Sequence, residues 1–387
     1  MGRLPRRATK WGFGMHGVMN DSVAAGILFG ALMASLLILI NARSIGELLG
    51  VMDYPDAFRK RHAEVTPLVG GLAIMVPIIL WAGASLIWNV SLDGKLYLAV
   101  LLCGAGATLV GYADDQSSTS PSSRLLSLFL LTAIALVVDP ELVPAQINWG
   151  SFEATAIPQW LAYILIAVAM TGYVNSVNMA DGQNGIVTGM YVIWAGCLML
   201  VTGGGAAGVS QALFETVLVT FLFNMGGRVF LGDSGSYGVT FAFGILAIMA
   251  HNRWGVSAET IVVWFFIPVM DCIRLMVSRA LQGQAPSDAD RDHFHHRLQD
   301  RVGKTYALCI YLGAVGTSSV VASILPRTAL VCMVLLTAFY FSFAWLTEAD
   351  GVAVQADGDE APADRVPASD TANIVKFDSK DSSTGRK

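Results

Sequence analysis

The chain has 387 residues, of which 54% are hydrophobic and 14% are charged, and its mean hydropathy is +0.58. Soluble domains carry about a quarter charged residues, so this composition excludes a soluble enzyme. It also excludes a disordered chain, and five cysteines are too few for a secreted disulfide scaffold. The net charge of −5 comes mostly from the acidic segment that begins at Glu348, so it indicates no partner for the apolar part.

Eleven segments are apolar enough to cross a bilayer as helices, since lipid offers no partner to exposed backbone groups and a span needs about 20 apolar residues. We therefore predict an all-α, polytopic integral membrane protein with about 11 transmembrane helices. The first segment lacks a small-residue cleavage site, which favours a retained span or signal anchor. The predicted spans are residues 22–40, 68–88, 96–112, 125–138, 158–174, 186–202, 211–227, 236–250, 259–277, 305–325 and 328–346.

Three regions follow from this pattern. Residues 1–21 form an N-terminal arm, residues 22–347 form the transmembrane domain, and residues 348–387 form an acidic tail. The tail is rich in Ala, Asp, Ser, Pro and Gly and has few large apolar residues, a composition typical of disorder. We expect the tail to be disordered and cytoplasmic.

The orientation follows from the loops, because Lys and Arg concentrate in cytoplasmic loops. Most of these residues lie in the loops on one side of the predicted spans, which places that side in the cytoplasm and the N-terminus outside. The short basic N-terminal arm favours the opposite orientation. Either the arm is an exception or translation starts at Met15 or Met19.

The span interiors are nearly free of charge. Glu215 is the main exception, and Asp271 and Arg274 lie near the inner end of another span. Transporters and channels usually place ionisable groups near the midplane of the membrane. The polar clusters of this chain lie at the cytoplasmic ends of the helices instead, which favours an enzyme at the membrane surface.

The first of five cytoplasmic clusters is DYPDAFRKRH at residues 53–62, followed by PLVGG at residues 67–71. Alone, Arg59 and Lys60 are typical of a positive-inside loop, and His62 follows them. Pro67 and the two glycines add a rigid backbone that another segment can approach closely, which a topology signal does not require.

The second cluster is the pair Asp114 and Asp115 at the end of a charge-free span, followed by Arg124. Two adjacent carboxylates beside lipid are costly unless a cation or a basic group meets them. They could bind Mg²⁺ or abstract a proton. A helix cap explains one aspartate but does not easily explain two.

The third cluster, NSVNMADGQNG at residues 175–185, contains Asn175, Asn178, Asp181 and Asn184. At helical spacing the first two share a face and Asp181 lies one turn further on. Converging amides and a carboxylate could bind a base, a sugar or a hydrated metal ion. A helix break with Asx caps is the equally weighted alternative.

The fourth cluster, FLGDSGS, runs from Phe230 to Ser236. Asp233 in a loop of Gly and Ser is typical of a ligand for a hard cation, with backbone N–H groups nearby for phosphate oxygens. Ordinary turn chemistry is the alternative for this motif alone.

The fifth cluster, DRDHFHHR at residues 290–297, contains His293, His295, His296 and Arg297. Three histidines suggest zinc, but no cysteine or fourth close ligand accompanies them and two arginines flank them. A cationic cluster for phosphate oxygens is therefore favoured over a zinc site, with a solvated basic loop as the alternative. Together the five clusters hold what phosphoryl transfer at a membrane face needs: carboxylates, basic groups and small residues.

These motifs resemble those of the polyprenyl-phosphate N-acetylhexosamine-1-phosphate transferases, which include the WecA, TagO and MraY enzymes. The resemblance extends from Asp53 to Arg297, with all five clusters in the family's order, and the first and fifth clusters are closer to WecA than to MraY. It implies that residues 22–347 transfer a HexNAc-1-phosphate, by default GlcNAc-1-phosphate, from a UDP-sugar to undecaprenyl phosphate. UMP is released, in the first membrane step of cell-surface polysaccharide synthesis.

The resemblance also implies a cofactor, partners and a location. The cofactor is Mg²⁺, with Mn²⁺ as a substitute, and the partners are the UDP-N-acetylhexosamine, the polyprenyl phosphate and the lipid bilayer. The active site faces the cytoplasm from the bacterial inner membrane. A homodimer is in keeping with the family, and no nucleic acid is expected.

Residue roles carry over motif by motif. Asp233 matches the Mg²⁺ ligand and Asn178 an asparagine that assists it, Asp114 is expected to be the base that deprotonates or positions the lipid phosphate, and Asp115 its structural or electrostatic partner. Asn175 and Asp181 resemble nucleotide-pocket residues, and Phe230 is expected near the uracil. The remaining implied substrate-binding residues are Arg59, Lys60, His62, Arg124, Asn184, His293, His295, His296 and Arg297.

The chain departs from the family pattern in three places near the implied nucleotide-sugar pocket. Asn184 stands where relatives often have Asp, Ala63 and Glu64 replace a common glycine, and Ala57 looks like an insertion. These changes leave the sugar open. Direct attack and a route through an aspartyl-phosphate both fit, and direct attack is favoured. A transporter of a nucleotide sugar or lipid-linked sugar is the alternative function, and a catalytically silent scaffold is a third.

Overall fold

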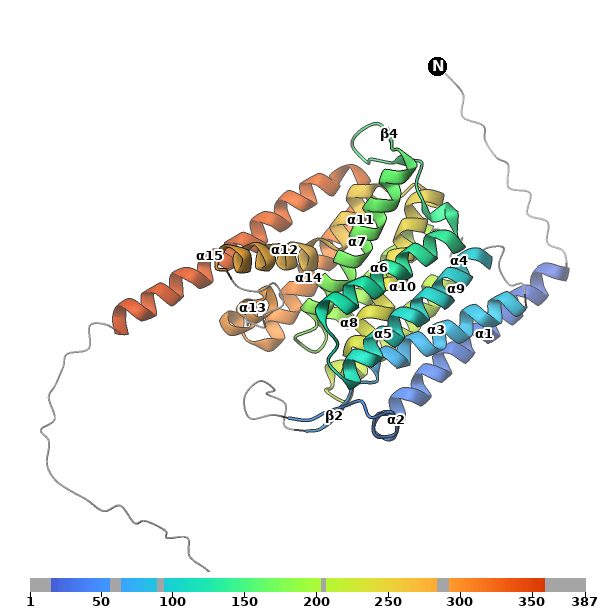
Figure 1. The fold of residues 1–387 in the computed structure, drawn as a ribbon, viewed down its shortest axis with the longest axis horizontal. Helices are drawn as coiled ribbons and strands as arrows, with labels where there is room; N and C mark the ends of the chain where they lie inside the picture. Colours follow the sequence, from blue (N-terminus) through green and yellow to red (C-terminus); the bar gives the residue numbers. More distant parts are fainter. Residues whose placement is uncertain (1–14, 56–63, 89–93, 203–206, 284–291, 359–387) are drawn as a thin grey trace, which may run out of the picture. The chain divides into compact units, whose positions relative to one another are not determined.

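The computed structural model describes residues 15–55, 64–88, 94–202, 207–283 and 292–358. Almost all of this part is helical, which confirms the predicted all-α class (Figure 1). In chain order the elements are α1 Met15–Ile40, α2 Ala42–Leu49, β1 Met52–Asp53, β2 Thr66–Pro67, α3 Gly70–Ile87, α4 Gly94–Ala99, a π-helical segment Val100–Gly104, α5 Ala105–Gln116, α6 Pro121–Val138, a 3₁₀ turn Pro140–Leu142, β3 Gln146–Ile147, β4 Thr155–Ala156, α7 Gln159–Ala180, α8 Ile186–Thr202, α9 Ala207–Met225, α10 Gly232–Trp254, α11 Ala258–Trp264, α12 Phe266–Leu281, α13 Phe294–Val302, α14 Lys304–Ile324, a 3₁₀ turn Pro326–Thr328 and α15 Ala329–Gly358.

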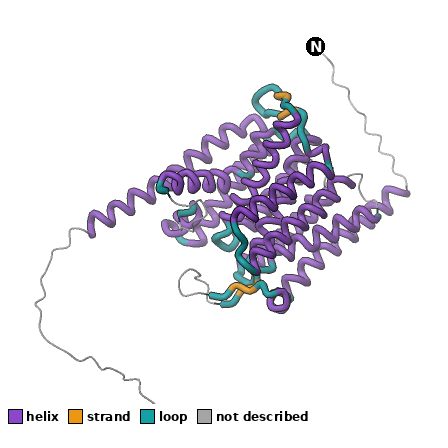
Figure 2. The backbone as a smooth tube through the Cα atoms, viewed as in Figure 1, coloured by secondary structure: helices purple, strands orange, loops and turns teal. Residues whose placement is uncertain are grey.

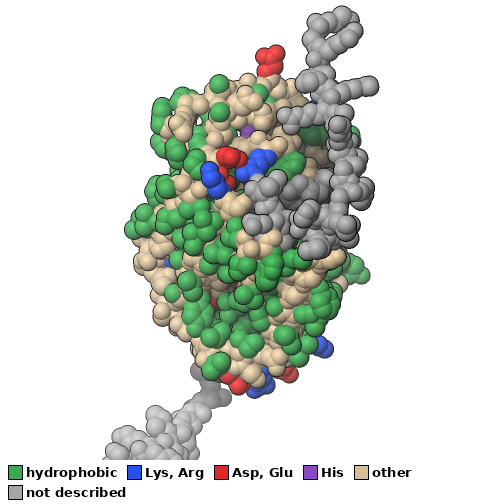
Figure 3. Space-filling view, turned by 90° about the vertical axis from the view of Figure 1, so that its right-hand side faces the viewer, with side chains coloured by type: hydrophobic (Ala, Val, Ile, Leu, Met, Phe, Trp, Pro, Cys, Tyr) green, Lys and Arg blue, Asp and Glu red, His purple; other side chains and the backbone are tan. Residues whose placement is uncertain are grey.

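The described helices make this a multi-pass membrane protein. Nine of them are long and apolar enough to cross a bilayer, and the bent pair α11–α12 makes ten if it is counted as one span. Helix α8, with 17 residues, is a shorter apolar helix. All eleven predicted segments thus fall on helices, although α1 begins at Met15, earlier than predicted. Hydrophobic side chains cover much of the surface that Figure 3 shows, and charged side chains gather there in small groups.

Helix α10 forms the centre of the bundle. In its apolar stretch 94% of the residues are buried, and it packs against α3, α5, α7 and α8. Its first half is rich in glycine and serine, and small residues let neighbouring backbones approach closely in a membrane. The ends of neighbouring helices can therefore lie close to the start of α10, where Asp233 is located.

The segment 259–277, predicted as one span, is broken in the structure. Helices α11 and α12 meet at an angle of 73°. The physical reason is Pro268, which has no N–H to donate to the carbonyl of Trp264 four residues earlier. The indole N–H of Trp194 donates to that carbonyl instead, at 2.8 Å. The break is thus stabilised from a neighbouring helix.

Two short antiparallel strand pairs lie at opposite ends of the bundle (Figure 2). At one end β1 pairs with β2, with Met52 opposite Pro67, and at the other β3 pairs with β4, with Gln146 opposite Ala156. The β1–β2 pair leads directly into α3 and lies close to the polar helix ends.

The acidic tail, predicted as disordered from residue 348, begins as helix in the structure. Helix α15 continues to Gly358. Extending an existing helix requires no new nucleation, and Ala, Glu and Gln in this stretch are good helix formers. Residues 359–387 lie outside the described residues, as do residues 1–14 of the arm.

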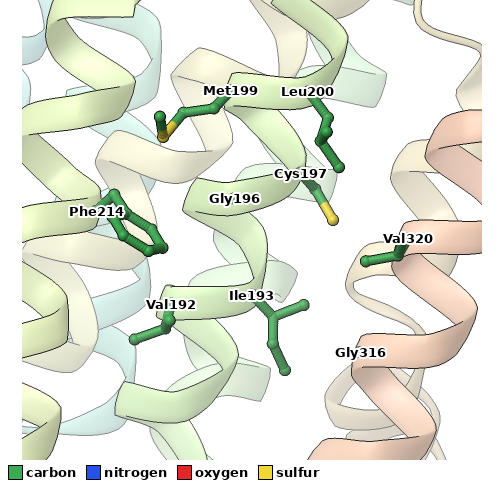
Figure 4. Close-up of a pocket in the computed structure, with 9 residues that line it drawn as sticks. All are labelled: Val192, Ile193, Gly196, Cys197, Met199, Leu200, Phe214, Gly316 and Val320. Atoms are coloured by element: carbon green, nitrogen blue, oxygen red, sulfur yellow. The ribbon is translucent and has the colours of Figure 1, made fainter.

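A cavity of about 640 Å³ lies between α8, α9 and α14. Figure 4 shows apolar side chains of all three helices around it. Its lining contains no carboxylate, histidine or basic residue, so it is separate from the polar clusters described below. The lining residues are Val192, Ile193, Gly196, Cys197, Met199, Leu200, Phe214, Gly316 and Val320.

Candidate active site

The second and fourth clusters meet where α5 ends and α10 begins. The Asp115 carboxylate accepts the backbone N–H groups of Asp233, at 2.8 Å, and Ser234, at 3.0 Å. A carboxylate that accepts the first N–H groups of a helix caps it and complements its dipole. Asp115 therefore holds the backbone that carries Asp233, as expected of a structural partner.

Gly111 lets these two helix ends approach. A Cβ atom at Gly111 would lie 2.1 Å from the carbonyl oxygen of Asp233, nearer than any real Cβ contact. The obstacle is backbone, which cannot rotate away. Only glycine fits between α5 and the start of α10.

Asn178 brings the third cluster to the same point. Its side-chain N–H₂ donates to Oδ1 of Asp233 at 2.6 Å and to Oγ of Ser236 at 2.8 Å. The amide nitrogen therefore faces Asp233, so in this arrangement Asn178 orients the carboxylate. To bind a metal ion beside Asp233, Asn178 would have to turn its side-chain oxygen toward Asp233.

Asp114 is buried and its oxygens accept several hydrogen bonds. The backbone and hydroxyl of Thr119 donate to Oδ1, at 2.6 and 2.8 Å. Arg124 donates to Oδ2 at 2.6 Å, and Tyr237 lies 3.4 Å from the same oxygen. The ion pair with Arg124 places a guanidinium beside the aspartates, as a phosphate site requires.

The first cluster reaches the site through its backbone. Phe230 donates its N–H to the carbonyl of Pro67, and Gly70 donates to the carbonyl of Phe230, each at 2.9 Å. A Cβ atom at Gly71 would lie 2.1 Å from the backbone nitrogen of Gly235. The close approach predicted for the two glycines is confirmed. Arg59, Lys60 and His62 lie outside the described residues.

Asn175 and Asn184, also of the third cluster, do not contact Asp233 as Asn178 does. The amide of Asn175 instead lies near the sulfur atoms of Met179, at 3.4 Å, and Cys272, at 3.8 Å. Asn184 lies in the turn before α8, near Gly227, where a Cβ atom would be 3.9 Å from its side-chain nitrogen. Asn175 and Asn178, which are at helical spacing, thus contact different neighbours.

The structure also identifies Asn224, which sequence reasoning missed. This buried amide accepts the backbone N–H of Gly185 at 2.7 Å and donates to the carbonyl of Val229 at 3.0 Å. It therefore ties the turn after α7 to the turn before α10. An amide in an otherwise apolar span was the signal that could have indicated it.

Asp181 follows the last residue of α7 and is partly buried. Burial, together with the negative charge of Asp115, raises the pKa of Asp181 from 3.8 to about 7. The Asp181 carboxyl therefore lies in the field of the aspartate cluster even though no hydrogen bond joins them. A bound cation or a hydrogen-bond donor there would favour its charged form.

The histidines of the fifth cluster pack closely together. The rings of His293 and His295 stack with centroids 5.4 Å apart, and those of His295 and His296 are 4.2 Å apart. A Cβ atom at Gly182 would lie 2.2 Å from Nε2 of His295. The fifth cluster therefore lies directly against the turn of the third.

Burial distinguishes His295 from the other two histidines of the cluster. Burial, with the neighbouring His296 and His293, lowers the pKa of His295 to about 3, and this side chain is 2% exposed. Burial therefore favours the neutral form of this ring while no anion is bound. Among the described residues its Nε2 has no hydrogen-bond partner, and this nitrogen packs against Gly182.

The fifth cluster is anchored by charged residues from α12 and by its own Asp292. Nδ1 of His293 lies 3.0 Å from Asp271, Arg297 pairs with Asp292, and Arg274 donates to the Asp292 carboxylate at 2.8 Å. Charged side chains inside a predicted span were the visible signal for Asp271 and Arg274. Their partnership with the histidines could not be seen in sequence.

The carboxylates at this site suit Mg²⁺. The charges of Asp114 and Asp115 both act on Asp233, and carboxylate oxygens are ligands that Mg²⁺ prefers. In the described part of the chain, no three His, Cys, Asp or Glu side chains form a complete metal-binding group. Mg²⁺ usually binds through one or two carboxylates with water and substrate phosphates, so these residues fit it.

Comparisons with known proteins agree with this site. A family model described as glycosyl transferase family 4 matches residues 97–251, which include Asp114, Asp115, Asn178 and Asp233. The undecaprenyl-phosphate alpha-N-acetylglucosaminyl 1-phosphate transferase of Escherichia coli strain K12 is 26% identical over 348 residues, 84% of this chain and 92% of that protein.

Two further relatives come from other bacteria. The protein of the same name from Yersinia pestis is 30% identical over 285 residues, 70% of this chain and 75% of that protein. A probable undecaprenyl-phosphate N-acetylglucosaminyl 1-phosphate transferase of Bacillus subtilis strain 168 is 27% identical over 282 residues, 69% of this chain and 75% of that protein. The chain belongs to glycosyl transferase family 4, the family of polyprenyl-phosphate N-acetylhexosamine-1-phosphate transferases that its motifs resemble.

Proposed function

We propose that this protein transfers GlcNAc-1-phosphate from UDP-GlcNAc to undecaprenyl phosphate and releases UMP. The observation that carries the proposal is the convergence of Asp115, Asn178 and Asp233, from three helices, beside the Asp114–Arg124 ion pair. The printed names of the bacterial relatives supply the donor sugar and the acceptor lipid. Nothing in the described residues favours the transporter alternative.

We further propose that Mg²⁺ is the cofactor and that Asp233 holds it, with Mn²⁺ as a substitute. The buried group of interacting carboxylates supports this choice, because such a group needs a cation to offset its charge. When bound, the ion would withdraw charge from the diphosphate of the donor. Asp115 and Asn178 would keep the Asp233 carboxylate in place through their hydrogen bonds.

The Asp114–Arg124 pair suits the acceptor phosphate. A phosphate oxygen that binds Arg124 competes with Oδ2 of Asp114 for the guanidinium, which leaves that carboxylate oxygen to take the proton of a phosphate monoester. The acceptor oxygen then forms a bond to the β-phosphorus of the donor, and the bond from that phosphorus to UMP breaks. This direct attack uses Asp114 as a base and needs no covalent enzyme intermediate.

We propose that the site lies at the cytoplasmic face of the bacterial inner membrane. Basic residues are more frequent in the segments on the side of the site than in the loops on the other side; those near the site include Arg124, Arg274, Arg297 and Lys304.

Family membership is the sole support for a homodimer, which light scattering of the purified protein would test.

The experiment measures UMP released by purified protein from UDP-GlcNAc, undecaprenyl phosphate and Mg²⁺. Asp233→Ala should abolish release, whereas Glu141→Gln, an exposed acid in the turn that leads to β3, should not alter it. A screen of other UDP-N-acetylhexosamines defines the donor. Absence of UMP with every donor, or full activity of Asp233→Ala, would refute the proposal.

A further inference from the structure

Asp271 lies at the centre of a buried network that joins three helices. It belongs to α12, and its side chain is 7% exposed. Its Oδ1 accepts the hydroxyl of Tyr340 from α15 at 2.6 Å and the backbone N–H of Phe294, at the start of α13, at 3.1 Å. Arg274 lies 3.3 Å from the same oxygen.

The direction of each hydrogen bond in this network can be assigned. Arginine has only donors, so Nε of Arg274 donates to the hydroxyl oxygen of Tyr340, 2.6 Å away. The hydroxyl proton of Tyr340 must therefore point to Asp271. With three donors on Oδ1, the Asp271 carboxyl group is favoured in its ionised form.

An ionised Asp271 determines the tautomer of His293. Its Oδ2 lies 3.0 Å from Nδ1 of His293 and can only accept, so Nδ1 carries the proton. Nε2 is then the ring nitrogen left for another molecule. When Nε2 also carries a proton, it can donate a hydrogen bond to an anion.

His293 also lies beside the active-site turn. Its ring stacks on His295, and Nε2 of His295 packs against Gly182. Gly182 lies in the turn that follows α7, the helix that carries Asn178. The side chain of His293 is 12% exposed, so one edge of the ring is accessible. A phosphate group bound near Asp233 is the anion that this edge could contact.

We propose that Asp271 is a positioning residue for His293: it fixes the imidazole so that Nε2 is presented to a phosphate oxygen of the substrates. The inference rests on the proposed function, because that function supplies the phosphate. Asp271 itself touches no substrate. It acts through the proton on Nδ1 and through the N–H of Phe294, which sets where α13 and its histidines begin.

A double-mutant cycle tests the proposal. Asp271→Asn should lower kcat for UMP release by about 10- to 100-fold, the range that loss of a hydrogen-bond partner costs at metal-binding histidines. In the His293→Gln background the same change should cost less than about twofold, because the residue through which Asp271 acts is gone. Equal losses in both backgrounds, or full activity of His293→Gln, would overturn the proposal.

Tyr340→Phe is the matched control. It removes a hydrogen bond from Oδ1 but leaves the Oδ2 contact with His293. We expect it to lower the melting temperature with a smaller effect on kcat than Asp271→Asn. A kcat loss equal to that of Asp271→Asn would show that the network is architectural and would count against positioning.

A measurement on the unmodified protein covers the case in which Asp271→Asn does not fold. Nitrogen-15 NMR of labelled histidines, assigned with His293→Gln, should find the proton of His293 on Nδ1. A neutral ring with its proton on Nε2 alone would refute the inference. If the protein releases no UMP at all, the proposed function fails, whereas the tautomer result still decides the Asp271–His293 pairing.

Discussion

Gly111→Ala tests whether the contact between α5 and α10 sets the geometry of the site. The added Cβ would lie 2.1 Å from the carbonyl oxygen of Asp233, whereas ordinary contacts begin at 3.4 Å. One helix end must therefore move by about 1.3 Å, and overpacking of this kind costs about 1–3 kcal/mol. Since Asp115 caps α10 from the same helix, the shift displaces Asp233 directly.

The assay is UMP release at saturating substrate, together with the melting temperature in detergent. A misplacement of about 1 Å in a reacting group can cost about 100-fold in rate, so we expect a loss of that order in kcat. Gly172→Ala is the control, because a Cβ atom there meets nothing within 4 Å in the membrane helix α7. Wild-type kcat for Gly111→Ala, with an unchanged melting temperature, would refute the reasoning.

Two further predictions concern stability. Burial and the charge of Asp115 raise the pKa of Asp181 to about 7. Above about pH 4 the unfolded state releases a proton that the native state still holds. The free energy of unfolding should therefore fall as the pH rises toward 7. Asp181→Asn should flatten this pH dependence of stability in metal-free buffer, and a steeper pH dependence would contradict the raised pKa of Asp181. Trp194→Phe should cost about 1–3 kcal/mol by leaving the Trp264 carbonyl unpaired, as a melting curve would show. Trp149→Phe, which loses an exposed hydrogen bond, should cost less, and equal losses would contradict this account of the break.

Most spans could be predicted because each one is an uninterrupted apolar stretch. The broken span shows where that approach is insufficient: Pro268 signals a break, yet hydropathy alone treats residues 259–277 as continuous. What makes the break tolerable is the indole of Trp194, 70 residues before Trp264 in the chain. No local pattern could indicate that partner.

The candidate site divides in the same way. Adjacent carboxylates next to an apolar span indicated Asp114 and Asp115, and a Gly- and Ser-rich turn indicated Asp233. The spacing of Asn175 and Asn178 predicted that they share a helix face, but Asn178 contacts α10 and Asn175 contacts α12. Helical periodicity shows which residues share a face and does not show what covers that face.

The sequence by itself determined that this chain lies in a membrane, how many apolar segments it has, and which residue types its five clusters contain. These properties are local, because composition and spacing act within one segment. The tertiary structure decided which clusters meet, as with Asp115 and the backbone of Asp233, 118 positions apart. It also decided that burial lowers the pKa of His295 while His293 faces a carboxylate, because the environment of a histidine depends on neighbours from other helices.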